Sequence, residues 1–161
     1  MTAVKIKRSQ IQSFLNTTPS TTATYSLIGD GVTTGKINYN PKTTEETYIH
    51  QDSATITVDS YAPVMPVEAT AKNGDPVFEY IDGLRRSRAV LAAAESDSVN
   101  VWMYKTGGPT AYPAEKQPVS IQLDDFGGDG GVAAKINFTL NFIGDPVLGT
   151  FNASTKAFTA S

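Results

Sequence analysis

Apolar and polar residues alternate along several stretches of this chain, and this period of two constrains the fold more than any other feature. In the clearest stretch, polar residues separate Ile136, Phe138, Leu140 and Phe142 from one another. Because successive side chains of a β-strand point to opposite faces, the pattern predicts a strand with one buried face and one polar face. Threonine clusters in the first half of the chain also favour extended backbone, since threonine branches at Cβ. The sequence therefore predicts a mainly β protein.

Glycine and proline divide the chain into predicted strands. Glycine supplies the positive φ angles of tight turns, and proline lacks the amide hydrogen that a strand ladder needs. Between such turns, the predicted strands span residues 22–28, 32–39, 54–61, 98–105, 118–123, 132–143 and 156–159. We expect the first two to form a hairpin across the turn at residues 29–31. In the third, the spacing of Ile56 and Val58 predicts a half-buried strand.

One helix is predicted directly after residues 73–75. Asp75 is suited to be the N-cap, and Pro76 is suited to the first helical position. Four apolar residues then fall on one face at helical spacing, namely Val77, Phe78, Ile81 and Leu84. We expect a short helix whose apolar face packs on a sheet.

These elements predict a two-sheet β-sandwich or distorted barrel with one flanking α-helix. A chain of 161 residues is the size of one domain and can bury a core without disulfides or a structural metal. The segment from Pro41 to Ser53 is polar and contains few apolar residues. We therefore expect a single domain over residues 1–161, from which a long extended loop at about 40–60 projects.

Charge and composition argue against several classes of function. Thirteen basic and sixteen acidic residues give a net charge of −3, which does not favour binding of nucleic acid through its phosphates. The chain has no cysteine, and therefore no thiolate nucleophile and no Cys-ligated metal site. No stretch approaches the roughly 20 apolar residues of a membrane-spanning helix, and the first fifteen residues have no continuous apolar core. We expect no cofactor and no membrane insertion.

The sequence also offers no recognisable catalytic group. His50 is the only histidine, and it lies in the polar segment without a serine motif nearby. Glu45 and Glu46 are adjacent, so in extended backbone they point to opposite faces, which is poor geometry for an acid and base pair. We therefore expect a protein that is not an enzyme.

A cluster of aspartates, Asp124, Asp125 and Asp129, lies in and before a glycine-rich segment. Carboxylates at such a spacing are compatible with calcium, but the terminal bidentate glutamate of an EF-hand is missing. A solvated surface turn explains the same residues without a ligand.

Arg85, Arg86 and Arg88 form a basic cluster near the end of the predicted helix. Cations interact favourably with the exposed carbonyl groups at a helix C-terminus, so helix termination and a surface ion pair explain them. The alternative is a salt bridge to acidic residues of a neighbouring subunit, because arginine is enriched at interfaces.

Several short segments, taken in order, resemble the major tail tube protein of long-tailed, siphovirus-type bacteriophages. The signature region lies between Gly29 and Tyr61, where Tyr39, Asn40 and Pro41 precede the run from Glu45 to Ile49. The remaining segments are residues 73–78 at the start of the helix, 149–151, and 157–159 in a closing strand.

The resemblance implies a β-sandwich with a flanking helix, six copies of which close a ring around a channel. Stacked rings would form the tail tube, and genomic DNA would pass through it without specific binding. The resemblance also implies that residues 40–60 reach toward the adjacent ring, which makes Tyr39, Pro41, Glu45, Glu46, Tyr48 and Ile49 the candidate assembly loop. The implied partners are further copies of the chain, a tape measure protein, a tail terminator, and baseplate or distal tail proteins. The implied location is the virion tail, assembled in the cytoplasm of the bacterial host.

Electrostatics adds an expectation about the channel. Basic side chains in the lumen would bind phosphates and retard the DNA, so we expect more acidic than basic residues there. Asp124 and Asp125 are the candidate lumen-facing residues, whereas the three arginines are expected to face outward or toward a neighbouring subunit.

Two other functions remain open from the sequence. The inner tube of a contractile tail or tailocin would share this fold. A carbohydrate-binding or adhesin-like β-sandwich would use Trp102, Tyr104 and Tyr112 as a stacking platform, although the alternating strand around Trp102 favours core packing.

Overall fold

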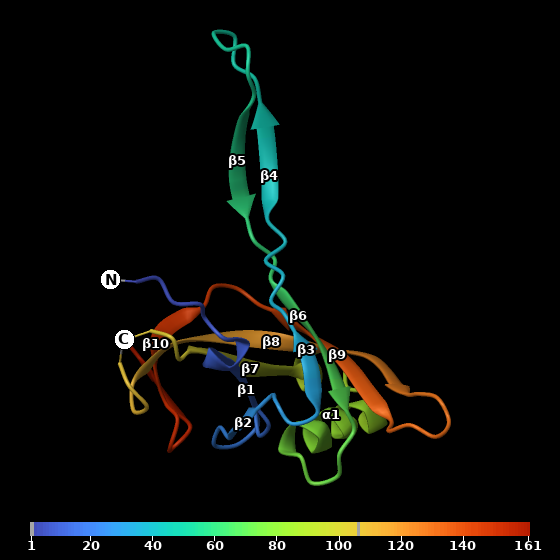
Figure 1. Cartoon of the computed structure of the whole chain (residues 1–161). Helices are drawn as coiled ribbons and strands as arrows, with labels where there is room; N and C mark the ends of the chain where they lie inside the picture. Colours follow the sequence, from blue (N-terminus) through green and yellow to red (C-terminus); the bar gives the residue numbers. More distant parts are fainter. Residues whose placement is uncertain (1, 106) are drawn as a thin grey trace.

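The computed structural model describes residues 2–105 and 107–161 as a mainly β fold with one α-helix (Figure 1). The helix α1 spans Pro76–Ser87, and two short 3-10 turns span Arg8–Gln10 and Leu91–Ala94. The strands are β1 (Ile11–Asn16), β2 (Tyr25–Leu27), β3 (Val32–Gly35), β4 (Lys42–Glu46), β5 (Thr55–Ser60), β6 (Val64–Thr70), β7 (Glu95–Trp102), β8 (Tyr112–Gly127), β9 (Lys135–Phe142), β10 (Val147–Asn152) and β11 (Ala157–Ala160).

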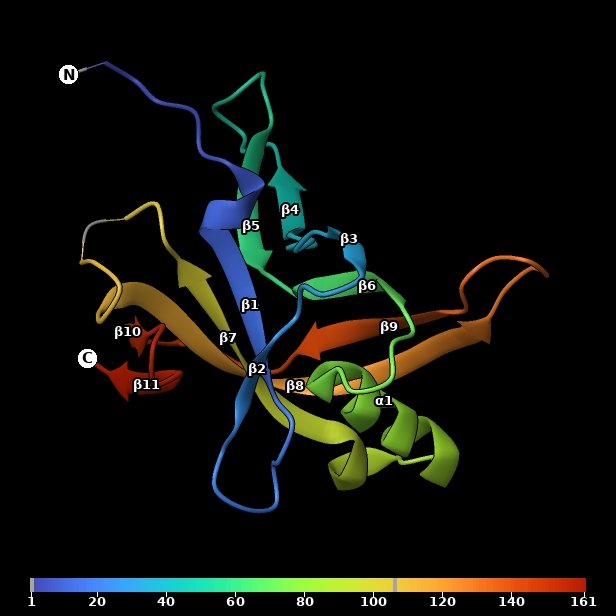
Figure 2. The same cartoon turned by 60° about the horizontal axis from the view of Figure 1, so that its bottom comes forward.

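All strands except β4 and β5 belong to one antiparallel sheet, with the order β2-β1-β7-β8-β9-β6-β3. The 16-residue strand β8 organises this sheet, because it pairs with β7 along one edge and with both β10 and β9 along the other. Its first half lies against β10, which in turn pairs with β11, and its second half lies against β9. Figure 2 shows that β8 extends across the whole body and that the sheet is curled.

The first core lies between α1 and the curled sheet. It contains the inward residues of β6 and β9 together with Val119 and Ile121 of β8 and Leu15 of β1. The helix contributes Val77, Phe78 and Ile81.

The second core lies on the other face of β1 and β7, where β10 and β11 cover them. Phe14 and Leu15 are adjacent in β1, so they point to opposite faces, and Phe14 enters the second core while Leu15 enters the first. Phe14 packs against Phe151 of β10, with ring centroids 4.6 Å apart. A Cβ at Gly149 would clash with the carbonyl oxygen of Thr159, so only glycine allows β11 to approach β10 this closely.

The predicted helix is confirmed, including its N-cap. The Asp75 side chain accepts a hydrogen bond from the Phe78 amide at 3.3 Å, and Pro76 occupies the first turn. The helix ends at Arg88, whose left-handed backbone (φ 52°) allows its amide to bond the carbonyls of the last turn. The predicted mainly β fold, with a distorted barrel and one flanking helix, is likewise confirmed.

Three expectations about strands were wrong. The turn at residues 29–31 does not join a hairpin, because β2 pairs with β1 and β3 pairs with β6. The strand predicted at 54–61 is not half-buried: Ile56 and Val58 of β5 are 65% and 50% exposed. The strands β1, β4, β6 and β10 were not predicted, because their short runs contain proline, glycine or many polar residues.

The core position of α1 has a measurable consequence. Ile81 is fully buried, so Ile81→Ala should lower the free energy of unfolding by roughly 2 to 5 kcal/mol through lost contacts and a cavity. Denaturant unfolding followed by circular dichroism measures this change. A loss below about 0.5 kcal/mol would mean that the helix does not anchor the first core.

Candidate functional site

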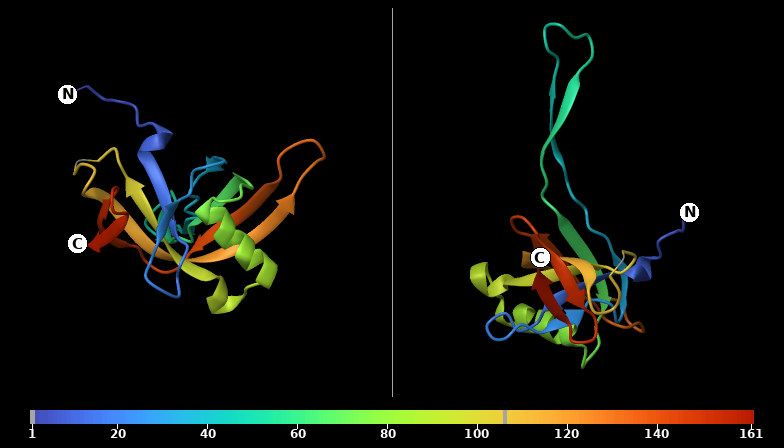
Figure 3. Two further views of the ribbon diagram at one scale, coloured as in Figure 1. Left: turned by 90° about the horizontal axis from the view of Figure 1, so that it is seen from below. Right: turned by 90° about the vertical axis from the view of Figure 1, so that its left-hand side faces the viewer.

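The most distinctive surface feature is a hairpin of β4 and β5 that stands away from the body (Figures 1 and 3). In the described residues these two strands form a separate two-stranded sheet. Its register pairs Glu45 with Ile56 and Thr43 with Val58, so these four side chains share one face. Glu46 lies on the opposite face with Thr44, Thr55 and Thr57, as the sequence predicts for adjacent residues. The predicted loop at 40–60 is therefore largely an ordered hairpin.

Several contacts join the two chain segments at the base of the hairpin. Ala62 donates its amide to the carbonyl of Tyr39 at 3.1 Å, and the Asn40 side chain donates to the carbonyl of Ala62 at 3.1 Å. The Tyr39 and Tyr61 rings meet edge to face across the two chain segments, with centroids 6.4 Å apart. These contacts hold the two segments together immediately before Pro41.

The tip of the hairpin carries the other residues of the candidate assembly loop. The Tyr48 hydroxyl donates to the Glu46 carboxylate at 2.8 Å, and the Tyr48 ring stacks on His50 at 6.3 Å. Ile49 between them is fully exposed. Single exposed apolar side chains are common on protein surfaces, so Ile49 alone does not mark a contact surface.

Charge is concentrated on this hairpin. Residues 40–60 contain four carboxylates (Glu45, Glu46, Asp52 and Asp59) and one cation (Lys42), which gives −3. Because the whole chain also has a net charge of −3, the remainder is neutral overall. The excess negative charge that the composition reveals therefore lies on the projection and not on the body.

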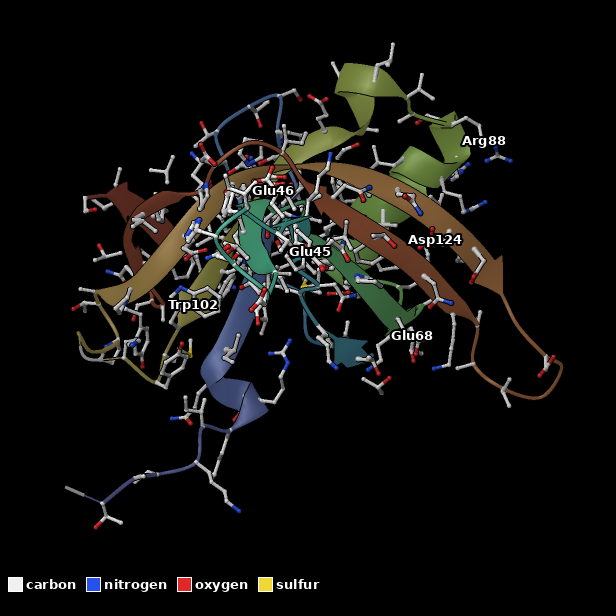
Figure 4. The ribbon with its side chains drawn as sticks, turned by 90° about the horizontal axis from the view of Figure 1, so that it is seen from above. Glu45, Glu46, Glu68, Arg88, Trp102 and Asp124 are labelled. Carbon is white, nitrogen blue, oxygen red and sulfur yellow. The ribbon has the colours of Figure 1, made fainter. Side chains whose placement is uncertain are left out.

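A second candidate surface is the polar face of β6, β9 and β8, opposite to the helix. Asp124 accepts hydrogen bonds from Thr139 at 2.7 Å and from Gln122 at 2.6 Å, and Asp125 accepts one from Asn137 at 2.8 Å. Both candidate lumen-facing aspartates are thus held in place by polar side chains of the sheet. Figure 4, viewed from the side of the hairpin, shows Asp124 and Glu68 on the strands that flank β9.

Glu68 is an acidic residue of this face that the sequence analysis missed. It lies on β6 and pairs in register with Asn137 of β9. The alternation of Met65, Val67 and Ala69 with polar residues would have revealed the strand, but Pro66 interrupts the pattern. Among the described residues that pair along β6, β9 and the second half of β8, Lys135 is the one cation on this face, so carboxylates outnumber cations there.

The three candidate arginines differ in their surroundings. Arg85 forms an ion pair with Asp82 at 2.7 Å and lies over the Phe126 ring, 4.7 Å from its centroid. It is thus engaged within the chain. Arg88 donates to the Arg85 carbonyl and is exposed, as is Arg86. Arg86 and Arg88 therefore remain the better placed of the three for contact with a neighbouring subunit.

The residues considered for chemistry are not assembled into a reactive site. In residues 2–105 and 107–161, no group of three metal-ligating side chains lies close enough together to hold an ion. Tyr112 packs against the second core and so is not part of an exposed platform with Trp102 and Tyr104. The pKa of Glu115 is raised above its usual value because the carboxyl is partly buried. A hydrogen bond from Trp102 offsets only part of this rise. Within the part of the chain that is described, no helix is long and apolar enough to cross a membrane.

The isolation of the hairpin from both cores predicts that it can be removed without unfolding the body. Replacing residues 42–60 by two glycines should change the free energy of unfolding by less than about 1 kcal/mol. The hairpin packs in neither core, and the length of a surface loop has only a small effect on stability. Denaturant unfolding of both chains tests this, and loss of cooperative unfolding in the shortened chain would contradict it.

Solved structures of other proteins share the fold of this chain. No protein-family model and no curated protein matches the sequence. Among solved structures, a chain in the tail of an empty gene transfer agent particle, determined with C6 symmetry, is similar with a TM-score of 0.64 and 14% identity. The match covers 97% of this chain and 100% of that one.

A second similar chain comes from an extracellular contractile injection system, in a structure of its sheath/tube terminator in the extended state. Its TM-score is 0.51 with 12% identity, over 92% of this chain and 99% of that one. Such low identities establish a shared fold and no more. The tail-tube-like resemblance of the sequence is therefore confirmed as a fold, which this chain shares with components of phage-like tails and contractile injection systems.

Proposed function

We propose that this chain is a structural subunit that self-assembles into stacked rings and thereby forms the tube of a phage-like tail. The observation that carries the proposal is the β4–β5 hairpin, which exposes apolar side chains far from either core of a tail-tube-like fold. A two-stranded hairpin alone is marginally stable in water, so a contact with another subunit would stabilise it.

Six subunits per ring is the symmetry we favour, because the similar gene transfer agent tail was determined with C6 symmetry. The partners would be further copies of this chain, together with a tape measure protein, a tail terminator and baseplate or distal tail proteins. The subunit would be located in the virion tail after assembly in the host cytoplasm. A closed ring also leaves no free sheet edge around its circumference, which protects an edge-rich fold from aggregation.

The inner tube of a contractile tail or tailocin is the second candidate. The similarity to a chain of a contractile injection system favours it, since the same fold serves in that assembly. A sheath gene beside the gene for this chain would select the contractile alternative.

The channel of the tube would be lined by the polar face of β6, β9 and β8. Glu68, Asp124 and Asp125 would face passing DNA there, and Lys135 would be outnumbered. Like charges repel the phosphates, so the DNA would move through without being held. Arg88 lies at the end of α1, beside the second half of β8 (Figure 4).

Assembly should protect the backbone amides of the hairpin from exchange. Hydrogen exchange of residues 42–60 should be fast in dilute subunits, where both strands are exposed, and slow in the assembled tube. Mass spectrometry of the two states measures the protection, with α1 as an internal control that stays protected in both. Equal exchange of the hairpin in subunit and tube would remove it from the interface.

Reversing one charge on the polar face should create DNA binding. Glu68→Lys tubes should retain short duplex DNA at about 0.15 M salt in a co-sedimentation assay, whereas wild-type tubes should not. Asp145→Lys, which makes the same charge change in an exposed loop away from this face, is the matched control. Equal retention by both variants would show that the polar face does not line the channel.

A further inference from the structure

The turn before α1 contains Asn73, the one asparagine of the chain that is followed by glycine. Asn73 and Gly74 are both exposed, and Gly74 has a positive φ of 91°. A Cβ at Gly74 would meet no other atom within 4 Å, so the space beside its backbone is open. The turn lies at the end of the body away from the β4–β5 hairpin (Figure 1). The side-chain amide of Asn73 and the backbone amide that follows it are therefore accessible to water.

An asparagine before glycine can react with its own backbone, because glycine has no side chain to hinder the approach. In this reaction the Gly74 nitrogen loses its proton and attacks Cγ of Asn73. The new N–C bond closes a succinimide ring, and the side-chain nitrogen takes up a proton and leaves as ammonia. Water then opens the ring at either carbonyl and gives aspartate or isoaspartate in place of Asn73. Water is the only co-reactant, so the reaction needs no oxidant, reductant or cofactor.

The structure places a carboxylate on the proton that this reaction must remove. The Gly74 amide donates a hydrogen bond to Oε1 of Glu79 at 3.0 Å. Glu79 lies in the first turn of α1, where the exposed amides of the helix N-terminus favour a negative charge. A hydrogen bond to a charged acceptor holds the proton on the nitrogen. A nearby negative charge also disfavours the negatively charged nitrogen that would attack.

We propose that Asn73 is a site of deamidation and that Glu79 protects it in the folded chain. The protection comes from the hydrogen bond to the Gly74 amide, which opposes the first step of the reaction. All of these contacts lie within one chain, so the protection does not depend on tube formation.

Protection of this turn matters for the start of α1. Isoaspartate in place of Asn73 would add a backbone atom close to the N-cap Asp75. The Asp75 carboxylate accepts a hydrogen bond from the Phe78 amide at 3.3 Å, and Phe78 is part of the first core. A longer backbone before Asp75 would displace this cap. Glu79 thus preserves the turn from which the helix enters the first core.

The rate of deamidation tests the protection directly. At mildly alkaline pH, Glu79→Ala should convert Asn73 roughly three to ten times faster than the wild type, the effect of losing one exposed hydrogen bond. Glu45→Ala removes the same carboxylate from the distant hairpin, so this matched control should change the rate by less than about twofold. Peptide mass spectrometry measures the conversion, and an isoaspartate-specific methyltransferase labels the product independently. Asn152, which precedes alanine, serves as the internal reference.

Hydrogen exchange separates protection by Glu79 from a general loosening of the turn. Base-catalysed exchange removes the same Gly74 proton, so NMR should show faster exchange of that amide in Glu79→Ala by a similar factor. The Asp75 amide donates to the Lys72 carbonyl at 3.3 Å in the same turn and should keep its rate. Glu79→Gln, which retains an acceptor oxygen without the charge, should exchange Gly74 at an intermediate rate.

A second comparison needs no variant. The wild type unfolded in denaturant gives the unprotected rate, and the folded wild type should deamidate Asn73 more slowly. Equal rates in the two states, or a wild-type rate in Glu79→Ala, would overturn the protection, as would equal acceleration of exchange at Gly74 and Asp75. An Asn73 that stays unmodified even in the unfolded chain would overturn the site itself. Cooperative unfolding of each variant confirms that it is folded, and none of these outcomes bears on the proposed function.

Discussion

Strand β8 is the element on which the rest of the structure depends. Because it is 16 residues long, its first half can pair with β7 and β10 while its second half pairs with β9. The sheet must curl to satisfy all of these pairings, and that curl leaves two separate faces to be buried. The helix covers one of them, and β10 with β11 covers the other. One long strand therefore explains why a small domain contains two cores.

The same arrangement leaves outside the two cores most of the side chains that could contact another molecule. With both cores filled by the body, the hairpin carries its own apolar residues and the entire net charge of the chain into solvent. A monomer would gain little from such a projection, since an isolated hairpin contributes marginal stability. The proposed contact with a second copy would account for these features.

The sequence was most informative where a local rule has few exceptions. Asp75 and Pro76 predicted the start of α1, and the alternation around Phe138 predicted the buried face of β9, because caps and period-two patterns depend on neighbouring residues. Strand pairing depends on residues that are distant in the sequence, so the predicted pairing of β2 with β3 was wrong. The exposure of Ile56 and Val58 could not be predicted from neighbouring residues, because their alternation with polar residues is the pattern of a half-buried strand. The place of Glu68 on the polar face required the curled sheet itself.

In the proposed assembly, the hairpin joins copies into a tube whose channel is lined by the polar face of β6, β9 and β8. Helical reconstruction by electron microscopy of the purified chain, after assembly at high concentration, would show this arrangement. We expect hollow tubes with Glu68, Asp124 and Asp125 on the channel wall and each hairpin buried against another subunit. Tubes whose channel is lined by α1, or whose hairpins extend freely into solvent, would contradict the proposal.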